Sequence, residues 1–140
     1  MAFVEKINWH YQVYTPHIEI RLISPDGMEW PNDGTDDLAV VDTGFTGEIL
    51  ISTTLYDMLE LNKWENIPNR HSTADGRCVE TLISNGSILI PKLHLEPFNV
   101  EIITMEGRKN GPILIGAKFL RKFQLLLDGP STKLRLCEEI

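Results

Sequence analysis

The residues with the clearest chemical potential are Asp42, Thr43 and Gly44, in the middle of the stretch Leu38 to Ser52, LAVVDTGFTGEILIS. Short apolar runs on both sides predict two buried strands, so Asp42 is expected in a tight loop where a strand stops. A carboxylate so placed is costly unless it is hydrogen-bonded or used in chemistry. The same tripeptide is also typical of a plain turn whose side chains bond their own backbone. The tripeptide alone leaves both interpretations open.

A second ordered pattern follows later in the chain. The apolar run Ile113 to Gly116 ends in glycine, and Ala117 to Phe123 and then the apolar run Gln124 to Asp128 follow it. Between the two patterns, Arg70 to Ile83 is expected to form a hairpin, with a plain surface hairpin as the alternative to a mobile flap. The expected tip of the hairpin is Thr73, Ala74, Asp75 and Gly76.

In this order, the motifs resemble those of retropepsin-like aspartic proteases. Val40-Val41-Asp42-Thr43-Gly44 fits the active-site loop. The segment from Ile113 to Asp128 looks like the other half of the signature, which implies an apolar strand ending in Gly116, a short helix over Ala117 to Phe123 and a closing strand over Gln124 to Asp128. The resemblance covers about residues 17 to 136 and is closest to single-domain cellular homologues with Asp-Thr-Gly-Phe-Thr-Gly. It implies an all-β fold, a closed acid-protease β-barrel with one or two short helices and a flap.

The length of the chain decides how a catalytic pair could form. The 140 residues, 42% of them hydrophobic, suffice for one domain with a real core, and residues 1–16 add an N-terminal strand to it. A water-activating dyad needs two carboxylates, yet the chain has no second Asp-Thr/Ser-Gly, and Asp128 before Gly129-Pro130 is typical of a turn. We therefore expect a homodimer with one Asp42 from each chain. Ile7 to Val13, Leu134 to Leu136, or both could form its interface.

The resemblance also implies the chemistry, which is that of an aspartic endopeptidase. Two adjacent Asp42 carboxylates would share a proton and activate a water that attacks a peptide carbonyl, with no cofactor and no metal. Gly44 would leave room for the partner loop, and Gly116 would let its strand pass beneath the loop. By resemblance, the Thr43 hydroxyl would hydrogen-bond across the two-fold axis. The alternative is that this hydroxyl hydrogen-bonds to the local backbone.

Two positions in the expected substrate cleft differ from the usual retroviral pattern. Phe45 stands where retroviral proteases usually have a small residue, and Thr46 where many have an acid. Substrate preference therefore does not transfer with the resemblance.

Composition limits the partners and the compartment. The net charge of −7 argues against nucleic acid, since phosphate binding needs clustered Lys and Arg. No secretory signal or membrane-spanning run is visible, so we expect a cytoplasmic protein without a membrane partner. Cys78 and Cys137 are expected as free thiols, with a disulfide as the minor alternative.

The remaining elements follow from periodicity. Alternation predicts strands at Ile7 to Val13 and Ile18 to Leu22. Ser52 or Thr53 is expected to cap a helix whose Leu55, Met58 and Leu59 face the core. Further strands are expected at Ile88 to Ile90, Leu93 to Leu95 and Val100 to Ile103.

Two other functions remain open alternatives to the protease. A non-catalytic dimeric β-barrel could bind extended peptides in the same cleft by strand addition. A monomeric storage or assembly domain could hold the loop closed. The intact Asp-Thr-Gly favours the enzyme, because a binding module has no need for an unpaired acid there.

Overall fold

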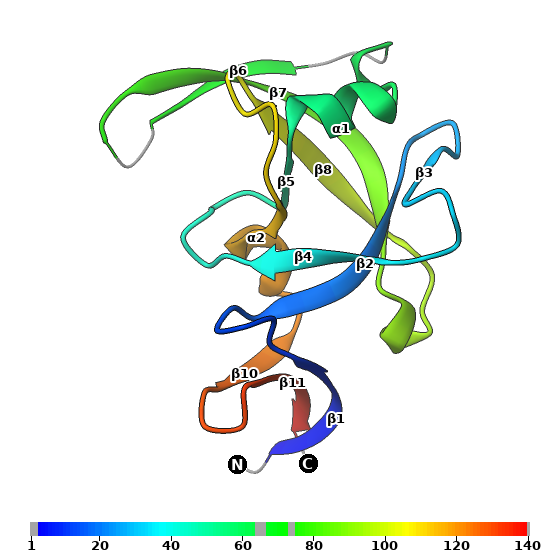
Figure 1. Cartoon of the computed structure of the whole chain (residues 1–140), viewed down its shortest axis with the longest axis vertical. Coiled ribbons are helices and arrows are strands. Elements are labelled where there is room, and N and C mark those ends of the chain that lie inside the picture. The colour runs from blue at the N-terminus through cyan, green and yellow to red at the C-terminus, as the bar shows by residue number, and fades with distance from the viewer. Residues whose placement is uncertain (1–2, 64–66, 73–74, 140) are drawn as a thin grey trace.

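The computed structural model describes residues 3–63, 67–72 and 75–139. About half of them form strands, with two short α-helices and two 3-10 turns (Figure 1). The strands are β1 (Phe3–His10), β2 (His17–Ile23), β3 (Glu29–Trp30), β4 (Asp37–Val41), β5 (Ile49–Ile51), β6 (Ile67–Ser72), β7 (Cys78–Leu89), β8 (Phe98–Met105), β9 (Ile113–Ile115), β10 (Gln124–Asp128) and β11 (Lys133–Glu139). The helical elements are α1 (Thr53–Met58), η1 (Leu61–Lys63), η2 (Pro91–Leu93) and α2 (Ala117–Leu120).

The main sheet closes on itself. Its strands follow the order β3-β2-β4-β9-β5-β8-β7-β6, and an additional pairing of β2 with β7 completes a ring of strands. Closure removes exposed edges from the strands of the ring, while β3 and β6 extend it at the two ends. The expected closed β-barrel with short helices is confirmed.

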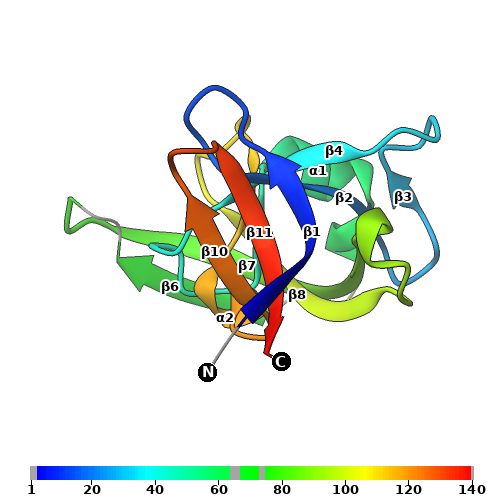
Figure 2. The same cartoon turned by 90° about the horizontal axis from the view of Figure 1, so that it is seen from below.

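A second, three-stranded sheet lies at one end of the barrel, with both chain termini beside it (Figure 2). Its order is β1-β11-β10, and every neighbouring pair is antiparallel. The N-terminal strand therefore pairs with the C-terminal strand of its own chain. Its bounds differ from the expected Ile7 to Val13, because the chain turns after His10 and Val13 takes a positive φ of 58°.

Alternation in the sequence explains how the core is filled. Along β2, the buried positions are Ile18, Ile20 and Leu22, while their neighbours face outward. Ser52 caps α1 as expected, since its hydroxyl accepts the Leu55 N–H at 3.1 Å. Phe98, Phe119 and Phe123 meet edge-on or tilted with ring centroids 5.5 to 5.7 Å apart, and join α2 to the barrel.

Two expectations about individual elements are wrong. Met58, expected in the core, is 50% exposed, because it is the last residue of α1 and lines a surface cavity together with Leu55. Leu93 to Leu95 is not a strand: Pro91 starts the 3-10 turn η2, and His94 leaves it with a positive φ of 53°. Short apolar runs beside proline are ambiguous between strand and turn.

Cys78 and Cys137 are both free thiols, as expected. Within the described ranges, no helix combines the length and the apolar character needed to cross a membrane.

Burial of Tyr56 predicts an alkaline loss of stability. Its side chain is 1% exposed, and burial raises the pKa of its hydroxyl to about 12. The folded protein holds this proton more tightly than the unfolded chain does. The protonated hydroxyl therefore contributes fully to the free energy of unfolding below pH 10, and this contribution is lost as pH rises through 12. We expect a fall in the free energy of unfolding of about 2 kcal/mol across that interval.

Urea titrations at several pH values measure this slope, with Tyr56→Phe as the matched variant. The phenylalanine variant lacks the ionisable group, so its stability should decline less steeply above pH 10 than that of the wild type. Parallel pH profiles for the two proteins would contradict the assignment to Tyr56.

Candidate active site

Asp42 lies at the first loop position after β4, as the sequence predicts. Its backbone N–H donates to the Ile115 carbonyl at 2.9 Å, and its own carbonyl accepts the Phe45 N–H at 3.2 Å. Its Oδ1 accepts the Gly44 N–H at 3.0 Å. Among the described residues, no donor contacts Oδ2, and the side chain is only partly buried. The carboxylate is thus fixed from one side and available from the other.

The strand order of the barrel determines the position of the Asp42 loop. β9 lies between β4 and β5, pairing parallel with β4 and antiparallel with β5. The chain from Asp42 to Glu48, which joins β4 to β5, must therefore cross the end of β9. Gly116 is the residue at that crossing.

Gly116 is required by the closeness of this crossing. A Cβ at Gly116 would lie 2.2 Å from the Gly47 carbonyl oxygen and 2.7 Å from the Phe45 carbonyl oxygen. Backbone hydrogen bonds hold the two segments together, with the Gly116 N–H donating to the Glu48 carbonyl and the Ala117 N–H to the Phe45 carbonyl, each at 2.8 Å. The structure therefore brings Gly116 directly under the Asp42 loop, where glycine alone fits.

Thr43 and Gly44 form the exposed tip of the loop. The Thr43 hydroxyl makes no hydrogen bond within the part of the chain that the structure describes, so the alternative of a local backbone bond gains no support. A Cβ at Gly44 would approach Asp42 Oδ1 to 3.3 Å and would meet no other atom within 4 Å. Within one chain, the tip therefore has open space in front of it.

Phe45 and Thr46 continue the loop, Phe45 half-buried and Thr46 exposed. The Phe45 ring lies against the glycine backbone below it: a Cβ at Gly47 would be 2.5 Å from its Cζ, and one at Gly116 would be 2.5 Å from its Cδ2. The aromatic ring thus fills the space that Gly47 and Gly116 leave. Part of its role is to support the loop.

Glu48 belongs to the loop support and is not among the residues expected from the sequence. It is only 9% exposed; its carbonyl accepts the Gly116 N–H, and its Oε1 accepts the Glu101 N–H of β8 at 3.1 Å. Glu101 in turn pairs with Lys118 of α2 at 2.9 Å. The sequence offers one signal for this supporting role: an acid stands directly before the apolar run of β5, and a buried charge needs a hydrogen-bond partner.

The expected hairpin is present over the loop side of the barrel (Figure 1). β6 and β7 pair antiparallel from Ile67 and Ile83 to Ser72 and Cys78. At the tip, Thr73 and Ala74 lie outside the described residues. Asp75 caps the turn through the Arg77 backbone N–H at 3.2 Å, and Gly76 has the positive φ of 83° that suits glycine.

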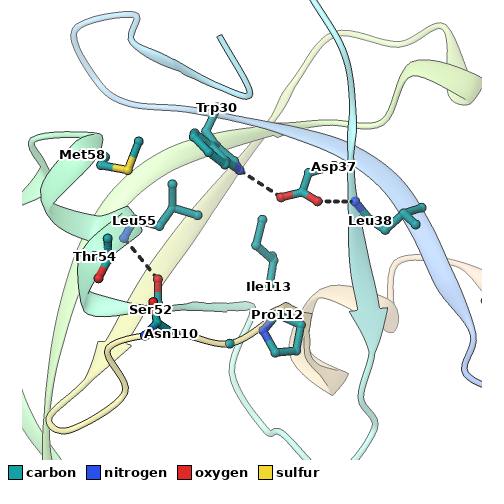
Figure 3. Close-up of a pocket in the computed structure, with 11 residues that line it drawn as sticks. Trp30, Asp37, Leu38, Ser52, Thr54, Leu55, Met58, Asn110, Pro112 and Ile113 are labelled. Carbon is teal, nitrogen blue, oxygen red and sulfur yellow. Dashed lines mark hydrogen bonds between the residues drawn. The ribbon is translucent and has the colours of Figure 1, made fainter. Parts of the chain in front are cut away.

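A separate cavity of about 370 Å³ lies at the other end of β4 (Figure 3). Trp30, Leu55 and Met58 line it together with Asp37. Both oxygens of Asp37 accept hydrogen bonds, Oδ2 from Trp30 Nε1 at 2.9 Å and Oδ1 from the Leu38 N–H at 2.8 Å. This carboxylate is satisfied and serves the structure, in contrast to that of Asp42.

Comparison with known structures identifies the fold. A retropepsin-like aspartic protease from Rickettsia conorii superposes with a TM-score of 0.62, over 97% of this chain and 99% of that protein, at 17% sequence identity. The chain therefore has the retropepsin-like aspartic protease fold. No protein-family model matches the sequence.

A sequence relative defines the family. The chain belongs to the same family as an uncharacterized protein of Archaeoglobus fulgidus, with which it is 31% identical over 116 residues. The match covers 81% of this chain and 87% of that protein.

Proposed function

We propose that the protein is an aspartic endopeptidase whose catalytic dyad is formed by Asp42 from each of two chains. The observation that carries the proposal is the state of Asp42: one carboxylate oxygen is held by the Gly44 N–H, and the other has no donor among the described residues. The retropepsin-like fold supports this proposal, since the structurally similar protein of Rickettsia conorii is a retropepsin-like aspartic protease.

The proposed mechanism requires the two carboxylates to differ in protonation. Two acids brought close in a partly dry cleft share one proton, as is general for aspartic proteases. The ionised member takes a proton from a bound water, and this water attacks the peptide carbonyl. The protonated member donates a hydrogen bond to the carbonyl oxygen, and a proton then passes to the leaving nitrogen. The oxygen of Asp42 that lacks a donor is suited to this exchange.

The test is cleavage of a diverse peptide pool from mildly acidic to neutral pH, by wild type and by Asp42→Asn, with the molecular mass of each measured in parallel. Cleavage by the wild type alone supports the dyad and gives the side-chain preferences. A dimer that binds peptides without cleaving them would contradict catalysis and favour the peptide-binding barrel. A strict monomer would contradict the dyad.

Gly44 gives a further prediction about the meeting of the two loops. Gly44→Val adds a branched side chain at the exposed tip, 3.3 Å from Asp42 Oδ1 at its first atom. We expect kcat/KM to fall roughly 10-fold or more and the dimer to weaken, because the added methyl groups occupy the space of the partner loop.

Gly129→Val is the matched control, since a Cβ at that exposed glycine meets nothing within 4 Å. Activity measurements and sedimentation on both variants separate a local effect from a general one. Full activity of Gly44→Val would show that the two loops do not meet at this residue.

A further inference from the structure

The outer edge of β10 is an unpaired sheet edge that carries apolar side chains. β11 pairs with β1 on one side and with β10 on the other, and in the described part of the chain no strand pairs with the far side of β10. Leu126 and Leu127 are 51% and 52% exposed. The run Gln124 to Leu127 carries no charge. Natural sheet edges usually carry charges or irregularities that prevent pairing, so this edge is open to a partner strand.

Leu127 is more exposed than the leucine opposite it on the same face of the sheet. Leu127 is opposite Leu134, and Leu125 is opposite Leu136, so these four side chains share one face of the sheet. Leu134 is fully buried on that face, whereas Leu127 is half-exposed, and β10 is the outer strand of the sheet in the described part of the chain. A cavity of about 470 Å³ opens beside the same strand, lined by Phe123, Gln124, Leu125, Leu126 and Cys137.

The opposite edge of the same sheet is built differently. β1 contains an irregularity between Glu5 and Ile7, where its register with β11 shifts. Charged side chains Glu5 and Lys6 lie at this point of the strand. Bulges and charges are the usual devices that keep an edge strand from pairing. The two edges of the sheet thus differ in their readiness to accept a strand.

The position of β10 relates this edge to the Asp42 loop. In Figure 1, the loop after β4 lies between the β6–β7 hairpin above it and β10 below it, and in both views β1 lies on the other side of β11 from β10 (Figures 1 and 2). The chain also connects the two directly, since Gly116 under the loop leads through α2 into β10. A partner chain that brings its own loop to Asp42 would therefore also meet β10.

We propose that β10 pairs antiparallel with β10 of a second copy, which joins the two three-stranded sheets into one continuous sheet across the dimer. The choice of a second copy rests on the proposed function, which needs two Asp42 loops. A two-fold axis perpendicular to the sheet pairs identical strands antiparallel and keeps Leu125 and Leu127 of both chains on one face. Each Leu127 then gains the neighbour that it lacks.

This interface differs from both terminal segments considered from the sequence. Leu134 to Leu136 lies in β11, whose two edges are already occupied within its own chain. Ile7 lies in β1, on the edge far from the Asp42 loop. The proposed interface uses the penultimate strand instead of either terminal strand.

Cysteine cross-linking tests the pairing without reference to activity. Single cysteines at Gln124, Leu125, Leu126 and Leu127 are introduced in a Cys78→Ser/Cys137→Ser background, with Val4→Cys on β1 as the control. Residues directly opposite in an antiparallel pair have Cα atoms about 5 Å apart, which suits a disulfide. We expect efficient self-cross-linking at the position nearest the axis and none at Val4. Cross-linking at Val4 alone, or at no position, would overturn the proposal.

A charge at the same edge provides an independent measurement. Leu126→Lys places two like charges near the axis and removes apolar burial, so we expect the dimer dissociation constant to rise roughly 100-fold. Val4→Lys, at a residue that is 47% exposed on β1, should leave it unchanged. An unchanged mass for Leu126→Lys, a dimer broken by Val4→Lys, or a wild type that is monomeric at all concentrations would each overturn the proposal.

The two proposals fail in different ways. A wild type that dimerises through β10 but cleaves no peptide would contradict the catalytic function and leave the interface standing. A wild type that cleaves peptides while Leu126→Lys keeps its mass would contradict the interface and leave the catalytic function standing.

Discussion

Asp42→Asn is expected to lower peptide hydrolysis by roughly 10³-fold or more while leaving the fold and the dimer intact. The amide has nearly the same shape as the carboxylate, and its oxygen can still accept the Gly44 N–H that Asp42 Oδ1 accepts at 3.0 Å. It cannot take a proton from water, so the attacking nucleophile is not formed. Initial rates on a cleaved peptide, with thermal unfolding and sedimentation of the same preparations, measure all three properties.

Asp57→Asn is the matched control, because Asp57 is an exposed acid on α1. Its activity should equal that of the wild type. Wild-type rates for Asp42→Asn would remove Asp42 from the catalytic role. An unfolded Asp42→Asn protein would instead show that this carboxylate stabilises the loop, and the activity loss would then carry no information on catalysis.

Gly116→Ala is expected to destabilise the protein by about 3 kcal/mol or more and to abolish activity. The new Cβ would lie 2.2 Å from the Gly47 carbonyl oxygen, so two backbone segments must separate. Their separation breaks or stretches the 2.8 Å hydrogen bonds from the Gly116 N–H to Glu48 and from the Ala117 N–H to Phe45. The Asp42 loop loses its support in the same movement.

Urea denaturation and kcat/KM measure the two effects, and Gly129→Ala is the control. A Cβ at Gly129 meets no atom within 4 Å, so this variant should match the wild type in both measurements. Wild-type stability of Gly116→Ala would contradict the close crossing of the loop over β9.

Local patterns predicted the elements that build the site. The loop after β4 and the capped helix α1 follow from short-range chemistry, such as apolar runs, a Ser52 cap and turn residues, whereas the succession of β9, α2 and β10 was expected from the resemblance of its motif. The two wrong expectations also have local causes. Met58 has the spacing of a core residue but is the last residue of its helix, and Leu93 closely follows a proline that starts a turn.

Long-range arrangement limited the rest of the prediction. Nothing in the spacing of the sequence states that β9 enters between β4 and β5. The place of Gly116 beneath the loop was expected from the resemblance alone, and the folded chain supplies the close backbone contacts that require glycine there. The burial of Glu48 follows from the same crossing. The pairing of β11 with both β1 and β10, which sequence spacing does not state, likewise leaves only the outer edges of those two strands for the proposed interface.

The insertion of β9 between β4 and β5 also determines when the site can come into existence. β4 and β5 flank the loop in sequence, and in the described sheet β9 lies between them and hydrogen-bonds to both, although it is synthesised much later. Such non-local pairings form late in folding, because a long stretch of chain must be ordered first. During translation the Asp42 loop therefore has no fixed geometry until Ile113 to Gly116 has left the ribosome. A chain that ends before this segment retains every residue of the Asp-Thr-Gly motif and lacks the strand that shapes it.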